Sequence, residues 1–318
     1  MLVSGLRLAF RLGIVIYLAS YGIVACYSQT EPPPNLSWLE GFPKVTIRKE
    51  VQEVNLILTV TDHRRHFVRD LTPAEITIQD NGEPPQQITY FEAQTGLPLR
   101  VALVIDTSNS VLAFFDFEKQ AAETFLKHTL RSASDIALVV GFNEQAWTAQ
   151  GPTVDHRLLA RAIKELRPGG YTAIYDAVAF ANQELGRIEG GQPSRRAIIL
   201  ITDGEDNSSH ISQEVAAEMS QQSGSIIYAL DAGGTYFRDK RAEQAMKQLS
   251  DLTGGQYLLA DNEERIGSAF AKIEAELRSQ YALGYKPASV KPDGSFHRIF
   301  VRVPEQLRVR YRQGYFAR

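Results

Sequence analysis

The sequence predicts an α/β protein with a doubly wound, mostly parallel sheet and a small β-sandwich built from the N- and C-terminal segments. Apolar runs such as Leu99–Ile105 and Ala197–Thr202 have the composition of strands buried on both faces. Segments of helical periodicity alternate with these runs, which is typical of a parallel sheet covered by helices. Both ends of the chain instead alternate with period two and contain turn signals, which indicates antiparallel strands.

Length and composition limit the classes of protein. The chain has 318 residues, of which 44% are hydrophobic and 22% are charged, so it is long enough for one large or two modest domains. The formal net charge is −3 and runs of Lys and Arg are short, so we expect no nucleic-acid partner. Cys26 is the single cysteine, which excludes an intrachain disulfide and a cysteine-based metal site.

Residues 1–28 have the layout of a secretory signal peptide. Arg7 and Arg11 precede the apolar run Leu12–Cys26, and polar residues follow it. The run is short for a transmembrane helix, which needs about 20 apolar residues. Export to the periplasm, the envelope or the medium is therefore expected, and an uncleaved N-terminal anchor remains an alternative.

Cys26 allows two kinds of processing. The segment Ile23-Val-Ala-Cys26 resembles a bacterial lipobox, and cleavage before the cysteine would leave a lipidated N-terminus attached to a membrane. Ordinary cleavage before Gln29 is equally compatible with the sequence. Residues 29–45 then form a stiff, proline-rich linker.

Residues 46–95 and 279–318 carry the alternating patterns. In the first segment Val54, Leu56, Leu58 and Val60 alternate with polar residues, and Asp80-Asn81-Gly82 is a hairpin turn signal. The expected strands are 54–60, 76–79, 87–91, 281–285, 297–303 and 307–311, with a turn or single helical turn at 72–75. Residues 46–95 are too few to bury a core of their own. We therefore expect the two segments to pair.

Residues 98–278 carry the alternation of strands and helices. The expected strands are Leu99–Ile105, Ile136–Phe142, Ala197–Thr202, Ser225–Ala229 and Gln256–Leu259. The expected helices are Glu118–Leu130, His156–Leu166, Ala173–Leu185, Ser212–Gln222, Lys240–Thr253 and Arg265–Arg278.

Side chains with oxygen groups follow two of these strands. Asp106, Ser108 and Ser110 lie on the loop after Leu99–Ile105, and Asp203 follows Ala197–Thr202. Thr172 precedes a predicted helix. Ligands of open α/β sheets bind at the carboxyl ends of strands. Carboxylate and hydroxyl oxygens suit a hard cation such as Mg²⁺ better than Zn²⁺.

The set Asp106, Ser108, Ser110, Thr172 and Asp203 resembles the metal-ion-dependent adhesion site of von Willebrand factor type A domains. That family has Asp-x-Ser-x-Ser, then a distant Thr and a distant Asp, and all five positions match here. The resemblance covers about Pro98 to Leu277, and the chain as a whole resembles a secreted bacterial subgroup. It implies an antiparallel edge strand at Gln145–Gln150.

The resemblance also implies a function. The site would hold Mg²⁺, or Mn²⁺ or Ca²⁺, and leave one position open for an Asp or Glu carboxylate of a protein partner. Residues expected on the rim of this site are Asn109, Tyr171, Gly204 and Asp206. Such chemistry is recognition without turnover, so we predict a binding module that is not an enzyme.

Other interpretations remain open from the sequence alone. The Asp and Ser residues can act as helix caps, and the Asp206 loop can belong to a helix start near Ser212. The protein can also be a structural or assembly component of the envelope that exchanges no ligand. A divergent hydrolase is a weaker alternative, because Ser108 and Ser110 lack the Gly-x-Ser-x-Gly elbow and no phosphate-binding Gly-Lys loop is present.

The N-terminal pattern gives a direct test. We expect the mature protein to have lost its first residues, because residues 1–28 combine a basic start with an apolar run. Mass spectrometry of the mature N-terminus decides between the alternatives. A diacylglyceryl group on Cys26 establishes lipidation, Gln29 as the first residue excludes it, and an intact Met1 on a cytosolic protein contradicts export.

Overall fold

The computed structural model describes residues 53–93, 97–113, 115–131, 134–188, 194–203, 205–232, 239–289 and 293–317. The predicted signal peptide, the linker and Cys26 lie outside these residues. No helix in the described ranges is both long enough and apolar enough to cross a membrane.

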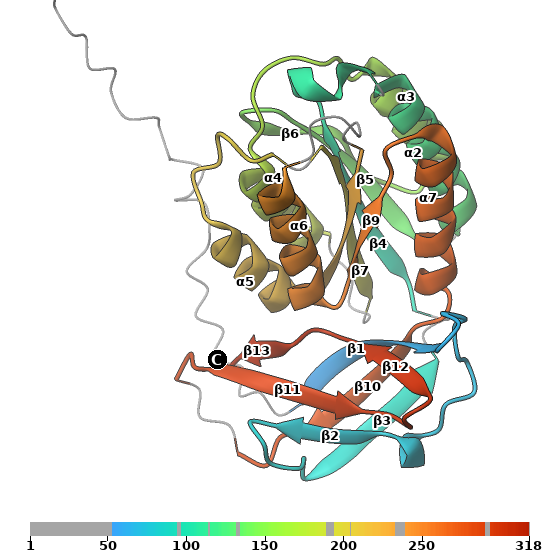
Figure 1. Cartoon of the computed structure of the whole chain (residues 1–318), viewed down its shortest axis with the longest axis vertical. Coiled ribbons are helices and arrows are strands. Elements are labelled where there is room, and N and C mark those ends of the chain that lie inside the picture. The colour runs from blue at the N-terminus through green and yellow to red at the C-terminus, as the bar shows by residue number, and fades with distance from the viewer. Residues whose placement is uncertain are drawn as a thin grey trace, which may run out of the picture. The chain divides into compact units, whose positions relative to one another are not determined.

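A six-stranded sheet forms the centre of the α/β part, in the order β6-β5-β4-β7-β8-β9 (Figure 1). Its strands are β4 (Leu99–Asp106), β5 (Ile136–Phe142), β6 (Ala146–Thr153), β7 (Arg195–Thr202), β8 (Ser225–Asp231) and β9 (Gln256–Leu259). All neighbours are parallel except β5 and β6, which pair antiparallel. The strand β6 at the edge is the one expected near Gln145–Gln150.

Helices cover both faces of this sheet. They are α2 (Phe115–Thr129), α3 (His156–Glu165), α4 (Ile174–Gly186), α5 (Gln213–Ser223), α6 (Lys240–Thr253) and α7 (Glu263–Leu277). One buried apolar cluster joins the sheet to α2, α3 and α7, and a second joins the other face to α4, α5 and α6. Alternate residues of β4 enter the two clusters, so this strand is buried on both faces, as predicted.

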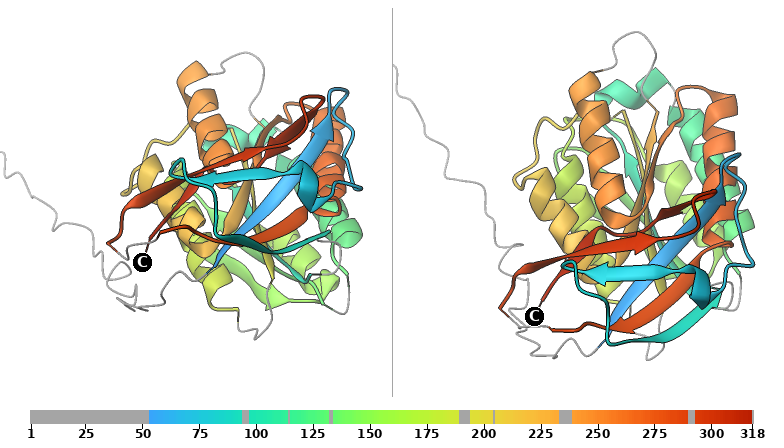
Figure 2. Two further views of the ribbon diagram at one scale, coloured as in Figure 1. Left: turned by 90° about the horizontal axis from the view of Figure 1, so that it is seen from below. Right: turned by 60° about the horizontal axis from the view of Figure 1, so that its bottom comes forward.

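Two smaller antiparallel sheets are built from both ends of the described chain. One has the order β12-β1-β10-β3 and the other β13-β11-β2 (Figure 2). Their strands are β1 (Val54–Asp62), β2 (Thr77–Asp80), β3 (Gln87–Ala93), β10 (Tyr281–Lys286), β11 (Phe296–Arg302), β12 (Leu307–Arg310) and β13 (Gly314–Phe316). One apolar cluster joins the two sheets. The predicted fold class is confirmed.

The pairing of the two sheets depends on strands that are far apart in the sequence. The central strand β1 lies between β10 and β12, with Leu56 opposite Leu283 and Val60 opposite Val309. The N-terminal strands therefore have C-terminal neighbours in both sheets. Neither segment supplies a complete sheet alone.

The turn at Asp80-Asn81-Gly82 differs from the hairpin that the sequence indicated. Asn81 and Gly82 have positive φ and Asp80 exchanges backbone hydrogen bonds with Glu83, so the tight turn forms. However, β2 pairs with β11 while β3 pairs with β10, so the chain changes sheet after the turn. The turn itself does not determine the partner of β3, which is selected by the way the two sheets are assembled.

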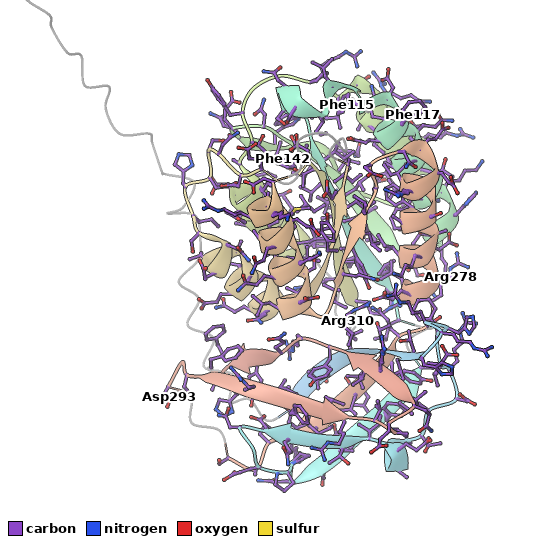
Figure 3. All side chains as sticks on the ribbon, in the orientation of Figure 1. Phe115, Phe117, Phe142, Arg278, Asp293 and Arg310 are labelled. Atoms are coloured by element: carbon purple, nitrogen blue, oxygen red, sulfur yellow. The ribbon has the colours of Figure 1, made fainter. Side chains whose placement is uncertain are left out.

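A buried ion pair connects the α/β part to the small sheets. Glu276 of α7 is 1% exposed and forms an ion pair with Arg310 of β12, which is labelled in Figure 3. Its Oε1 atom also accepts hydrogen bonds from Thr59 Oγ1 of β1 at 3.1 Å and from the Tyr228 hydroxyl of β8 at 2.8 Å. A buried carboxylate needs such donors, so this contact fixes the last turn of α7 against both parts.

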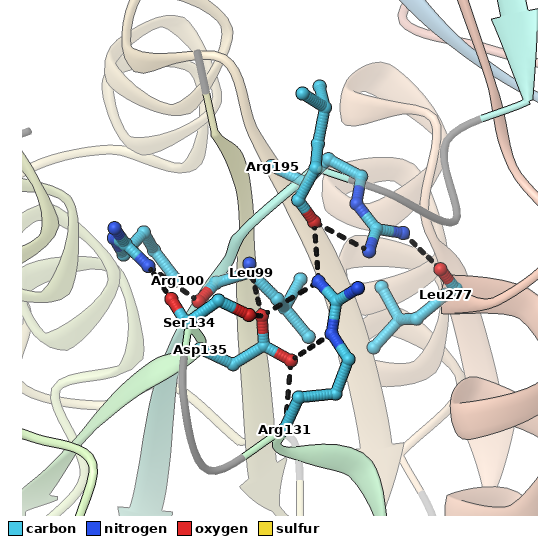
Figure 4. A network of polar contacts seen from close by, with 8 residues as sticks. Leu99, Arg100, Arg131, Ser134, Asp135, Arg195 and Leu277 are labelled. Carbon is cyan, nitrogen blue, oxygen red and sulfur yellow. Dashed lines mark hydrogen bonds and ion pairs between the residues drawn. The ribbon is translucent and has the colours of Figure 1, made fainter. Parts of the chain in front are cut away.

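A second polar network holds the amino ends of the central strands (Figure 4). Asp135, just before β5, accepts hydrogen bonds from the Leu99 N–H at 2.9 Å and from Arg131 Nε at 3.0 Å. At the start of β7, Arg195 donates to the carbonyl of Leu277 at the end of α7. This network lies at the opposite edge of the sheet from Asp106.

Removal of residues Tyr281–Arg318 tests the pairing of the two ends. It would take away β10 to β13 and leave the buried faces of Val54, Leu56, Leu58 and Val60 without partners. We expect the shortened chain to aggregate and its segment 53–93 to become sensitive to protease, whereas the α/β part, which has its own two core clusters, should lose less. Solubility and limited proteolysis beside the full chain provide the measurement. Equal protection of 53–93 in both chains would show that the segments fold independently.

Candidate metal centre

The sequence-predicted site residues meet at the carboxyl edge of the central sheet. Asp106 is the last residue of β4, and Asp203 directly follows the neighbouring parallel strand β7. Ser110 lies in the short 3-10 helix η2 (Asn109–Ala113), and Thr172 comes shortly before α4. The parallel register between β4 and β7 places Ile105 beside Ile201, so the two aspartates come from adjacent strand ends.

Asp106 is fully buried and held by two donors. Thr202 Oγ1 donates to its Oδ2 at 2.6 Å, and the Ser108 N–H donates to its Oδ1 at 2.8 Å. Burial nevertheless raises the pKa of Asp106 to about 6, and the negative charge of Asp203 acts in the same direction. These two donors orient the carboxylate, and no Lys, Arg or His within the described ranges forms an ion pair with it.

The serine loop places its two hydroxyls together. Ser108 is buried, Ser110 is exposed, and their Oγ atoms lie 2.9 Å apart. The intervening Asn109 N–H donates to the Gly170 carbonyl at 3.2 Å. This hydrogen bond ties the Asp-x-Ser-x-Ser loop to the loop that carries Thr172.

Thr172 is tied in turn to the loop after Asp203. Its N–H donates to Asn207 Oδ1 at 2.9 Å, and its carbonyl accepts from the N–H groups of Asn207 and Ser208 at 3.0 and 3.1 Å. The Thr172 side chain is 2% exposed. The three loops that carry the five predicted residues thus form one hydrogen-bonded unit.

The rim residues fall into different environments. Tyr171 is 70% exposed and Asn109 is also exposed, as a surface rim requires. Asp206 is half-buried and its Oδ1 accepts the Ile174 N–H at 2.7 Å, so it caps α4, whereas Ser212 caps α5. Gly204 lies outside the described residues. Leu112, which no sequence pattern pointed out, is 60% exposed two residues after Ser110.

The loop after Asp203 is anchored by a second carboxylate. Asp176 in the first turn of α4 accepts hydrogen bonds from the His210 and Ile211 N–H groups at 3.0 and 3.1 Å, and its Oδ2 lies 2.7 Å from His210 Nδ1. Asp176 is buried. Residues 206–211 are therefore fixed on α4.

Several buried oxygens in this part of the structure have no hydrogen-bond partner, which bears on whether a cation could bind at the carboxyl ends of the strands. Asp203 Oδ1, Ser208 Oγ and both carboxylate oxygens of Glu118 are buried and have no hydrogen-bond partner within the described residues. Oxygens of this kind cost free energy unless a donor or a cation contacts them. No group of three or more His, Cys, Asp and Glu side chains in the described ranges is arranged to hold an ion, so hydroxyls would have to complete the coordination. The donor set fits a hard cation.

The comparison with protein families identifies the domain that contains these residues. A family model described as von Willebrand factor type A domain matches residues 101–205, which include all five predicted site residues. This match identifies a von Willebrand factor type A domain in residues 101–205. Domains of this family typically mediate protein–protein interaction or adhesion.

The chain is distantly similar to a curated protein. Calcium-activated chloride channel regulator 1 of Bos taurus is 28% identical over 207 residues, which are 60% of this chain and 21% of that protein. The chain thus spans about a fifth of the curated relative that it matches.

Two solved structures illustrate the likeness. A von Willebrand factor type A protein from Catenulispora acidiphila is 12% identical, with a TM-score of 0.48, and covers 84% of this chain and 72% of its own. The von Willebrand factor domain of the type V pili tip protein Mfa5 from Porphyromonas gingivalis is 14% identical, with a TM-score of 0.45, and covers 56% of this chain and 94% of its own.

Proposed function

We propose that this chain is an extracytoplasmic binding protein whose von Willebrand factor type A domain holds a divalent cation and uses it to bind a carboxylate of a protein partner. Mg²⁺ is the expected ion, with Mn²⁺ or Ca²⁺ as substitutes. The residues that would hold it are Asp106, Ser108, Ser110, Thr172 and Asp203. The observation that carries the proposal is the buried, unpartnered Asp203 Oδ1 at the strand end beside Asp106.

Each residue would have a separate task. Asp106 and Asp203 supply negative charge from adjacent strand ends, and Thr202 with the Ser108 N–H fixes the direction of the Asp106 carboxylate. Ser108, Ser110 and Thr172 supply neutral oxygens. When bound, the ion supplies a positive charge that attracts an acidic side chain, because three of the five ligands carry no charge.

The solvent side of the site supports recognition of a macromolecule. Ser110, Asn109 and Tyr171 are exposed, while Asp106 and Thr172 are buried. An ion held between these groups would face the solvent from the side of Ser110. Tyr171 and Leu112 would offer apolar contact area beside it, so an acidic residue flanked by apolar groups suits this surface.

We also propose that the protein lies outside the cytoplasm and that it is not an enzyme. The signal-like layout of residues 1–28 supports an extracytoplasmic position, with membrane attachment through lipidated Cys26 or an uncleaved N-terminal segment as variants. We propose a non-enzymatic role because the serines of the site are hydrogen-bonded to each other, and no histidine in the described part of the chain bonds to either of them. The second candidate is an envelope assembly protein whose ion exchanges no ligand.

Calorimetry with Mg²⁺ and Mn²⁺ tests the metal site. We expect residues 29–318 to bind one ion at a main site, and Asp106→Ala and Asp203→Ala each to weaken binding more than about 100-fold, because each removes a charged ligand. Asp116→Ala is the control, since this carboxylate on the neighbouring helix α2 is exposed. No heat of binding with the unaltered chain, or equal affinity in Asp106→Ala, would refute the site.

A pull-down from the native envelope tests the use of the ion. Partners should be retained in Mg²⁺, released by a chelator and restored by added Mg²⁺, because the ion would form the contact with the partner's carboxylate. Asp106→Ala should retain none of them under any condition. Partners that stay bound in chelator would favour the assembly protein with no ligand exchange.

A further inference from the structure

Glu118 is a buried carboxylate that the five-residue pattern does not include. It lies in the first turn of α2, shortly after the Asp106–Ser110 loop, and is 1% exposed. Both of its carboxylate oxygens are without a hydrogen-bond partner in the described part of the chain. Acidic residues in the first turn of a helix usually face water or cap the helix, and Glu118 does neither.

The surroundings of Glu118 contain the two aspartates of the site. Its pKa is raised well above the ordinary value by burial first, and then by the negative charges of Asp106 and Asp203. The adjacent Lys119 does not compensate this charge, because its ammonium group pairs with Asp116 at 3.0 Å. The charges that raise the pKa of Glu118 are therefore both negative, and both belong to residues of the predicted site.

If Glu118 had only a structural role, its carboxyl group would lack hydrogen-bond partners in either protonation state. As a carboxylate it would be a buried charge without a donor, and as a carboxylic acid it would be a buried hydroxyl without an acceptor. A leucine or methionine would fill the same volume without that cost. A cation held by Asp106 and Asp203 would lower this cost, because its positive charge would stabilise the negative charge of a nearby carboxylate that is not itself a ligand.

We propose that Glu118 is a third carboxylate of the metal centre, which increases the affinity for the divalent ion from the α2 side without being a direct ligand. This inference rests on the proposed function. The absence of a three-carboxylate group close enough to hold an ion, within the described residues, argues for a position outside the direct ligands. Groups outside the direct ligands commonly change metal affinity by about 10- to 100-fold.

The experiment compares Glu118→Gln and Glu118→Met with the unaltered chain in Mg²⁺ and Mn²⁺ calorimetry. The Gln variant keeps the shape and removes the charge, and the Met variant also removes the oxygens. We expect both to weaken binding about 10-fold or more. Without metal, the Met variant should fold at least as stably as the unaltered chain, since it removes buried oxygens that have no partner among the described residues. Circular dichroism melts with and without Mg²⁺ should show a smaller metal-induced rise in Tm for both.

Glu123→Gln is the matched control, because Glu123 lies on the same helix but pairs with Lys164 at 3.3 Å. It should bind the ions as the unaltered chain does. Unchanged affinity in both Glu118 variants would overturn the inference and leave the five-residue site intact. Weak binding in the Met variant alone would overturn the role of the charge. No binding by the unaltered chain would overturn the proposed function itself, and the inference with it.

Discussion

The candidate site depends on one constraint, which is that two neighbouring parallel strands each end in an aspartate. The register of β4 and β7 brings Asp106 and Asp203 to the same edge, where Asp106 is fully buried and Asp203 is partly buried. Like charges held in this way are unfavourable without a cation. The hydroxyls and the three loops are arranged around this pair of strand ends.

Hydrogen bonds between loops convert this edge into a fixed arrangement. The serine loop contacts Gly170, Thr172 contacts Asn207 and Ser208, and the last of these loops is anchored on Asp176. Side chains that lie on loops are usually mobile, but each loop here is bonded to the next. Preorganisation of this kind lowers the cost of gathering ligands around an ion.

The small sheets are joined to the α/β part through α7. The buried Glu276 near its end receives donors from β1, β8 and β12, and the chain continues from this helix directly into β10. Arg195 holds the carbonyl of Leu277 from the other side. The end of α7 is therefore constrained by both parts of the structure, so a change in its position would require breaking a buried ion pair.

The sequence by itself determined the fold class, the order of the elements and the residues that gather at the sheet edge. Buried runs and strand ends are local features, and the carboxyl ends of parallel strands always meet at one edge. It also indicated that Tyr171 is exposed, since two glycines precede it. Helix ends were less well determined, and α2 begins at Phe115, earlier than the Glu118 that apolar spacing suggested.

Only the tertiary structure decided which strands pair across the chain and how polar groups are partnered. The turn after β2 could be predicted from its residues. The partners of the strands on either side of it could not, because β11 pairs with β2 and β10 pairs with β3 from the far end of the chain. The capping of α4 by Asp206 and the burial of Glu118 have the same origin. Contacts between distant segments leave no local pattern, because they are fixed by packing and not by propensity.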